Sequence, residues 1–229
     1  MAETPAGEIV PFDRAACLAA AGRLYSTGPP LLRRLQHHRP RVCPFELLIP
    51  HVPPGSHVLD VGCGAGLFLG LLDEAGRLAT GLGVEVSAPA VALARRLPGV
   101  ARGRLAFTLA TPADPLPAGP FDVVSMIDVA HHVRPAAQRG TIEAAFARVR
   151  PGGVFLYKDM ARRPRLSAWA NRLHDMIVAC ESIHYLPIED VDRWINELGG
   201  VRRNAFTARR LWYRHEVRVY RRPAAPPAG

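Results

Sequence analysis

Three evenly spaced glycines, with an acidic side chain on either side, form the most informative pattern in the sequence. In VLDVGCGAG the glycines are Gly62, Gly64 and Gly66. Asp60 precedes them, and Glu85 lies near the end of the next apolar segment. Glycines let the backbone turn sharply and approach a ligand closely, and a helix that follows them directs free N–H groups at it. Because a carboxylate can accept hydrogen bonds from two ribose hydroxyls, the pattern predicts a nucleoside site.

The glycine spacing differs from that of a dinucleotide-binding loop. The GxGxxG fingerprint would place its third glycine at position 67, where the chain has Leu67. The alternative to an active enzyme is a Rossmann-like domain that binds a different nucleoside from the one such an enzyme would use, or that has lost its catalytic activity.

A second unusual residue is Lys158, the only lysine among the 29 lysine and arginine residues. It lies beside Asp159 in the apolar segment VFLYKDM. Arginine is a wide planar group that stays protonated, whereas lysine is a compact donor whose pKa can move. We therefore expect a specific role for the ammonium: binding an acceptor oxygen, pairing with Asp159 or orienting a base. A structural ion pair, or chance survival of the lysine, is the alternative.

Short apolar strands alternate with helices through the middle of the chain. The expected strands are 57–61, 78–87, 104–110, 121–129 and 154–160, and the expected helices are 66–75, 87–97, 138–150, 166–182 and 187–200. This alternation predicts a mainly parallel sheet covered on both faces. Residues 201–222 are expected to form two strands that pair antiparallel. The carboxyl edge of such a sheet, where ligands bind, would collect Asp60, Glu85, Asp128 and Lys158.

The flanking segments differ in composition from this α/β region. Residues 1–12 and 223–229 are rich in Pro, Ala and Gly, and we expect disordered tails there. Residues 13–54 are expected to form a helical cap, and 55–222 the α/β domain. Within that domain, 160–187 is expected to be a helical insertion near an acceptor pocket.

Composition excludes several classes of protein. The formal charge of +9 suggests an anionic partner, but the arginines form short, dispersed clusters, and the bias toward arginine is typical of a GC-rich genome. Nucleic acid is therefore not the expected partner. The four cysteines lack zinc-ligand spacing and are expected to be reduced, as in a cytoplasmic protein. No apolar segment approaches the roughly 20 residues that span a bilayer.

Taken together, Asp60, the three glycines and Glu85 resemble the (D/E)xGxGxG motif of the class I S-adenosylmethionine-dependent methyltransferases. The resemblance covers about residues 53–223 and extends to the segments FDVVSMIDVAHHV and RVRPGG. It implies an α/β, Rossmann-like fold: a seven-stranded, mainly parallel sheet with helices on both faces and a reversed last strand. It also implies S-adenosyl-L-methionine as the cofactor.

The same resemblance assigns roles to residues around the glycines. The loop would cradle the methionine part of the donor, and Glu85 would hold its ribose. Pro112 stands where the family usually has an aspartate that faces adenine, so Asp114 or Thr111 is expected to substitute. The predicted donor-binding residues are Asp60, Gly62, Cys63, Gly64, Gly66, Glu85, Asp114 and Asp128.

An acceptor oxygen or carbon must lose a proton during methyl transfer, which requires a base that titrates near neutrality. Histidines 131, 132, 174 and 184 are candidates, with a structural or surface role as the alternative for each. The predicted catalytic residues are His132, which the resemblance places nearest the fourth-strand edge, His174 and Lys158. Adjacent histidines without further carboxylate or thiolate spacing are weak evidence for metal, so none is expected.

The predicted function is methyl transfer to oxygen or carbon of a small metabolite that is lipid-like, polyketide-like or aromatic. An RNA methyltransferase is one alternative, but the fourth strand ends in MIDVAH, where base-amino methyltransferases usually have (N/D)PP(Y/F). A non-catalytic module that binds S-adenosylmethionine is another. The short arginine clusters leave open an acceptor tethered to an acidic carrier protein. The sequence indicates no oligomeric state.

Overall fold

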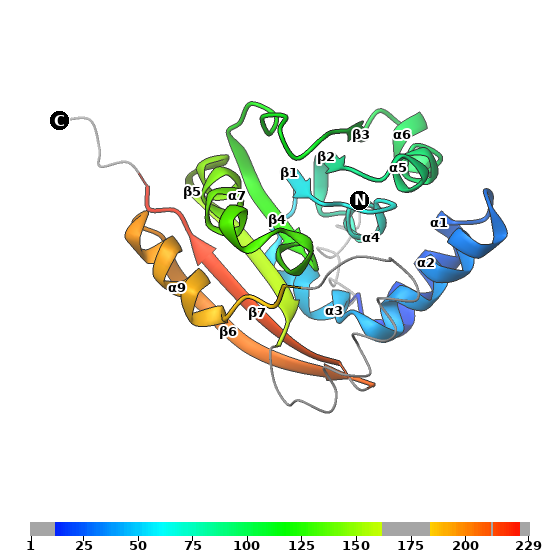
Figure 1. The fold of residues 1–229 in the computed structure, drawn as a ribbon. Helices are drawn as coiled ribbons and strands as arrows, with labels where there is room; N and C mark the ends of the chain where they lie inside the picture. The colour runs from blue at the N-terminus through cyan, green and yellow to red at the C-terminus, as the bar shows by residue number, and fades with distance from the viewer. Residues whose placement is uncertain (1–11, 162–183, 212, 225–229) are drawn as a thin grey trace, which may run out of the picture.

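The computed structural model describes residues 12–161, 184–211 and 213–224. Seven strands form one sheet in the order β3-β2-β1-β4-β5-β7-β6 (Figure 1). Neighbours from β3 to β5 pair in parallel, and β7 runs antiparallel to both β5 and β6. The predicted mainly parallel sheet with a reversed last strand is therefore confirmed. The strands are β1 (Ser56–Val61), β2 (Leu78–Glu85), β3 (Leu105–Leu109), β4 (Phe121–Ile127), β5 (Val149–Met160), β6 (Val201–Arg210) and β7 (Tyr213–Arg221).

Helices cover both faces of this sheet, as the alternation of elements predicts. Residues of α1, α3, α4 and α5 pack in one buried cluster, and residues of α7 and α9 pack in the other. The helices are α1 (Arg14–Leu24), α2 (Pro30–Val42), α3 (Phe45–Leu48), α4 (Leu67–Glu74), α5 (Ala88–Ala94), α6 (Pro98–Ala101), α7 (Pro135–Ala147) and α9 (Ile188–Glu197), with the 3-10 turns η1 (Ile49–His51) and η2 (Ala130–His132).

The central strands are apolar on both faces because both are buried. In β1, Val58 lies in the first cluster and Leu59 in the second. Successive side chains of a strand point to opposite faces, so each face receives every second residue. β5 alternates in the same way, with Phe155 and Leu156 in different clusters. Near-continuous apolar strands are typical of parallel sheets.

The N-terminal helices pack against the beginning of α4. The side chain of Asp13 caps α1 by accepting the N–H of Ala16 at 2.8 Å. Leu24 lies so close to the helix of Gly70 that a Cβ at Gly70 would be 2.9 Å from the Leu24 methyl carbon Cδ1. The hydroxyl of Tyr25, just after α1, donates to the carbonyl of Ala65 at 2.8 Å. These helices therefore contact the glycine segment directly.

Strand β5 begins earlier than the sequence predicts. Val149 already pairs with Phe121, so the Pro-Gly-Gly segment before the expected strand lies inside β5, at a register irregularity. The N–H of Gly152 donates to the carbonyl of Arg222 at 2.8 Å, so a contact with residues that follow β7 ties this segment to the sheet. Such distant pairing is not visible in the local sequence.

Several expectations fall on residues that the structure does not describe. The helix expected at 166–182 lies outside the described residues, as do most of the insertion and nearly all of both tails. Among the helices that are described, none is long and apolar enough to cross a membrane.

Candidate active site

The glycine loop follows β1 at the carboxyl edge of the sheet. Gly62, Gly64 and Gly66 all have positive φ angles, of 68°, 55° and 79°. The N–H groups of Gly62 and Cys63 donate to the carbonyl of Val84 at 2.9 and 3.0 Å, which ties the loop to β2. An L-residue in this left-handed region costs roughly 1–2 kcal/mol, so the glycines are needed for the backbone path itself.

The space around the three glycines differs. A Cβ at Gly62 would lie 2.5 Å from a methyl carbon of Val129, and one at Gly66 would lie 2.6 Å from the ring of Phe107. A Cβ at Gly64 would meet nothing within 4 Å. The outer two glycines are therefore also required by packing, whereas Gly64 borders open space in which a ligand can approach the backbone.

Glu85 closes the other side of this space. Its Oε2 accepts the N–H of Gly64 at 2.8 Å, and its Oε1 accepts the N–H groups of Val86 and Ser87 at 2.9 Å each. Because each carboxylate oxygen can accept two hydrogen bonds, Oε2 keeps one position for a ligand hydroxyl. The open space at Gly64 and this acceptor fit the nucleoside that the motif predicts.

Asp60 lies beneath the loop and is almost completely buried. Its Oδ1 accepts a hydrogen bond from the hydroxyl of Ser125 at 2.6 Å. Burial raises the pKa of Asp60 to about 7. Sequence reasoning missed Ser125, and only the pairing register of β1 with β4, which sets Asp60 opposite Ser125, could have identified it.

The other predicted donor-binding residues occupy two distinct settings. Asp114 lies beyond β3, is exposed, and accepts the N–H of Thr111 at 2.5 Å, which closes its own turn. The Cys63 side chain packs against β2, since a Cβ at Gly83 would lie 2.6 Å from its sulfur. Burial raises the pKa of the Cys63 thiol well above its usual range.

Lys158 is completely buried and pairs with Asp128. The distance from Lys158 Nζ to Asp128 Oδ1 is 2.5 Å, and Arg39 from α2 approaches Asp128 Oδ2 at 3.4 Å. Burial alone would raise the pKa of Asp128, but the two cations hold it well below its usual range. Asp128 has a φ of 58°, in the left-handed region, at the turn that follows β4.

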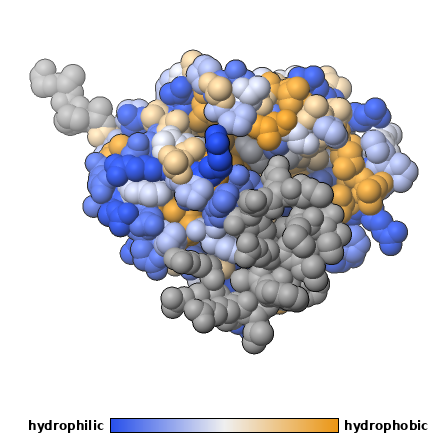
Figure 2. Space-filling view, in the orientation of Figure 1, coloured by the Kyte–Doolittle hydropathy of each residue, from blue (hydrophilic) through white to orange (hydrophobic). Residues whose placement is uncertain are grey.

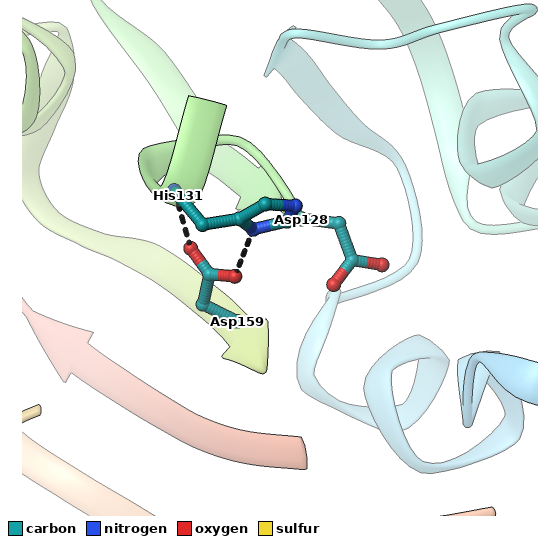
Figure 3. A group of neighbouring side chains, drawn as sticks. All are labelled: Asp128, His131 and Asp159. Carbon is teal, nitrogen blue, oxygen red and sulfur yellow. Dashed lines mark hydrogen bonds and ion pairs between the residues drawn. The ribbon is translucent and has the colours of Figure 1, made fainter. Parts of the chain in front are cut away.

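Asp159 does not pair with Lys158, although pairing was one of the predicted roles. Adjacent residues of a strand point to opposite faces, so Asp159 lies on the face that carries Tyr157. Its carboxylate instead accepts hydrogen bonds from the ring nitrogen Nδ1 of His131 and from the backbone N–H of His131 at 3.2 Å (Figure 3). It also accepts the backbone N–H of Met160 at 2.7 Å. The hydroxyl of Tyr157 lies 3.4 Å from Oδ2.

The histidines at the end of β4 differ in exposure. His131 is 3% exposed, whereas His132 is exposed, with its ring centroid 4.1 Å from that of His131. Burial would lower the pKa of His131, but the neighbouring Asp159 raises it above its usual range. The predicted base His174 lies outside the described residues.

Candidate ligand atoms of Asp128, His131 and Asp159 lie within 4.8 Å of one another, which is close enough to consider a metal ion. The carboxylates, however, already receive the Lys158 ammonium and several N–H donors. A cation would have to displace these donors from a buried network. The three side chains thus belong to a hydrogen-bonded network, and the absence of a metal ion stays a prediction.

Two further buried side chains surround Lys158 and were not singled out by the sequence. Burial raises the pKa of the Cys43 thiol to about 11. Burial, together with the Lys158 charge, lowers the pKa of His215 to about 4, so its imidazole stays neutral. Both residues come from elements far from β5 in the sequence, which is why only the folded chain brings them together.

Comparisons with known proteins find relatives of the chain. A family model described as a methyltransferase domain matches residues 35–199. A ubiquinone biosynthesis O-methyltransferase from Pseudomonas paraeruginosa is 33% identical over 117 residues, which is 51% of this chain and 49% of the relative. The chain thus spans about half the length of the curated relatives that it matches.

Solved structures share the fold at low sequence identity. Magnesium protoporphyrin IX methyltransferase from Synechocystis, with bound SAH, has a TM-score of 0.66 at 15% identity, covering 92% of this chain and 96% of that one. A [4+2]-cyclase has a TM-score of 0.62 at 15% identity, covering 79% and 81%. A protein named for a different reaction shares the fold, so these likenesses establish architecture alone.

Proposed function

The chain belongs to the methyltransferase domain family, and on that premise we propose that it transfers a methyl group from S-adenosyl-L-methionine to an oxygen or carbon of a small metabolite. The observation that carries the proposal is the glycine loop. Open space at Gly64 faces a free acceptor position on Glu85, at the carboxyl edge of a parallel sheet. Ligands of open α/β sheets bind at that edge.

Glu85, the loop glycines and Asp114 have distinct tasks in this proposal. Oε2 of Glu85 accepts a ribose hydroxyl of the donor. The loop glycines let the backbone lie against the methionine part, and Asp114 with Thr111 flanks the adenine. When bound, the donor supplies a methyl carbon on a sulfonium, which an acceptor atom attacks in line.

Asp128 provides a carboxylate that stays ionised beside a positively charged donor. Its side chain is 14% exposed, and Lys158 and Arg39 hold it in place. The lowered pKa of Asp128 keeps the carboxylate ionised at neutral pH. We propose that Lys158 acts mainly by fixing Asp128, and that it affects the acceptor through this contact.

The acceptor is proposed to be lipid-like, polyketide-like or aromatic. The curated relative described above is named for ubiquinone biosynthesis, which supports an apolar metabolite. On α2, Leu31 is 71% exposed and Leu35 is 37% exposed, and a hydrophobic group lies over this helix in Figure 2. Exposed apolar side chains on the helix that also carries Arg39 suit such an acceptor.

Two finer points are also proposals. Arg34 and Arg41 are exposed on α2, which supports docking of an acidic carrier that presents the acceptor. Cys17, Cys43 and Cys63 are free thiols, which supports a location of the protein in the reducing cytoplasm.

Calorimetry with a matched pair of variants tests donor binding. Gly64→Ala and Gly76→Ala each place a side chain at a positive φ with nothing within 4 Å, but only Gly64 lies in the loop. We expect both to lose similar stability, and only Gly64→Ala to lose affinity for S-adenosylmethionine, by at least about tenfold. Equal affinities in the two variants would contradict the loop assignment.

Turnover is tested separately with methyl-labelled S-adenosylmethionine and fractionated metabolite extracts. The wild-type protein should place label in a small molecule found by mass spectrometry. Tight donor binding with unlabelled products in every fraction would instead favour a non-catalytic module. Label in RNA alone would favour the nucleic-acid alternative.

A further inference from the structure

We propose that His131 is the catalytic base that removes the acceptor's proton and that Asp159 is the residue that positions it. This inference rests on the proposed function and names the proton acceptor of the same site. Among the described residues, these two form a histidine–aspartate pair that is almost completely buried at the carboxyl edge of the sheet. The sequence favoured the neighbouring His132.

The hydrogen bonds of Asp159 dictate which nitrogen of His131 can act. Oδ1 of Asp159 accepts the N–H of Met160 and Nδ1 of His131, and Oδ2 accepts the backbone N–H of His131. A carboxylate with these partners acts as an acceptor, so Nδ1 carries a proton. The other ring nitrogen, Nε2, is left with its lone pair, and Figure 3 shows it on the side away from Asp159, toward Asp128.

The backbone around His131 is fixed from a second direction. The N–H of His184 donates to the carbonyl of His131 at 2.8 Å. The amide of Gln138, on α7, donates to the carbonyls of Ala130 at 3.1 Å and of His184 at 2.8 Å. The short turn η2 therefore cannot rotate freely, and the imidazole keeps one orientation. A base that is held in place before the acceptor arrives loses little entropy in the reaction.

Burying such a pair costs free energy, which a functional role would explain. Removing two ionisable groups from water carries a penalty of several kcal/mol per ion, and hydrophobic residues of similar volume would often be as stable. The rest of this face is packed with apolar residues such as Phe155 and Met126. A buried imidazole next to the donor site is, however, what a base protected from bulk water requires.

The proposed step balances without any further reactant. The proton of an acceptor hydroxyl passes to Nε2 of His131 as the oxygen electron pair forms the bond to the methyl carbon. The carbon–sulfur bond breaks, and its electron pair stays on sulfur, which becomes a neutral thioether. The imidazolium, stabilised by Asp159, then releases its proton to solvent.

The charges around His131 set its pH dependence. Asp159 and Asp128 favour the protonated imidazole, and the Lys158 ammonium opposes it. His132 packs against the ring, and Tyr157 lies beside Asp159. The net effect is a raised pKa, so activity should increase with pH through a value above the usual range of histidine. Removing the Asp159 charge should lower that value.

The test compares two adjacent, identical substitutions in the full-length protein with methyl-labelled S-adenosylmethionine and the metabolite extract. His131→Gln should lower kcat by at least about 100-fold, and His132→Gln by less than about tenfold. His57→Gln, at the opposite edge of the sheet, serves as the control for folding and assay. Calorimetry should find the same donor affinity in all three.

Asp159→Asn separates positioning from mere structural support. The acidic, ascending limb of its kcat profile should move to lower pH, and NMR titration of the His131 imidazole should show the same shift without donor. An unchanged limb and an unchanged titration would overturn the positioning role. A smaller loss of kcat in His131→Gln than in His132→Gln would overturn the assignment of the base. Wild-type protein that binds no donor would instead refute the proposed function.

Discussion

The glycine loop after β1 and the charged cluster of Asp128, His131, Lys158 and Asp159 lie at the same edge of the sheet. They differ in whether backbone or side-chain groups form them. The loop binds with its backbone, and the contribution of Gly62, Gly64 and Gly66 is to have no side chain. The cluster works through side chains, with the buried Lys158 in direct contact with the partly buried carboxylate of Asp128.

The two regions therefore fail in different ways. A loop made of backbone is disrupted by adding atoms, because a Cβ meets Val129 or Phe107 and the φ angle becomes strained. A buried ionic cluster is disrupted by removing charge, because the partner left behind has lost its water as well. Substitutions that add volume or remove charge should consequently separate the two regions.

The largest effect is expected for Lys158→Met. The side chain is completely buried, and its loss leaves Asp128 with the more distant Arg39. Breaking such a pair should lower the free energy of unfolding by about 4 kcal/mol. Urea denaturation measures the loss, and the double variant Lys158→Met with Asp128→Asn should recover most of it. A double variant no more stable than Lys158→Met would show that the pair is not coupled.

A somewhat smaller effect is expected for Gly66→Ala. The new Cβ would lie 2.6 Å from the ring of Phe107, at a φ of 79°. Strain and overpacking together should lower the free energy of unfolding by about 3 kcal/mol. Gly76→Ala, at a φ of 64° with nothing within 4 Å, isolates the strain and should lose about 1 kcal/mol. If thermal or urea denaturation gave equal losses for the two, packing against Phe107 would be irrelevant.

The pH dependence of stability should reveal Asp60, which lies beneath the loop and pairs with Ser125 of β4. Its pKa of about 7 in the folded protein lies above the ordinary value of 3.8, so the folded state binds a proton that the unfolded state releases. Stability contributed by this group is therefore complete below pH 3.8 and is lost as the pH rises toward 7.

The variant Asp60→Asn should lack this loss. Between pH 5 and pH 8 the wild type should lose about 2 kcal/mol more than the variant, as measured by urea denaturation across the range. Parallel curves for the two proteins would mean that Asp60 titrates normally.

The smallest effect is expected for a surface ion pair that links the cap to the loop helix. Arg23 lies 2.7 Å from Glu74, but its side chain is 60% exposed. Because solvent screens such pairs, Arg23→Ala should change the free energy of unfolding by less than about 1 kcal/mol. Denaturation in low and high salt measures it, and a loss above about 2 kcal/mol would place this contact with the buried cluster instead.

The fold and the position of the glycine loop were largely predictable. The alternation of strands and helices, the three glycines and Glu85 are local patterns, and each appears in the structure at or near its expected position. Local patterns are reliable where backbone geometry alone selects the residue, as the positive φ at Gly62 does.

The contacts within the charged cluster were less predictable, and Lys158 illustrates why. Its rarity marked it in the sequence, but its partner proved to be Asp128 and not the adjacent Asp159. The partners of Asp159 were missed because His131 is 28 residues away along the chain. Strand register and the turn after β4 decide these contacts.

The sequence by itself determined the order of the elements, the backbone path of the glycine loop and the family, because these depend on short-range periodicity and on residues that only certain φ angles tolerate. Only the tertiary structure decided which charges meet. Pairing in a sheet joins residues that are distant in sequence, and the pleat sends neighbouring side chains to opposite faces. The proposed base therefore emerged from the packing of η2 against β5, which no local pattern encodes.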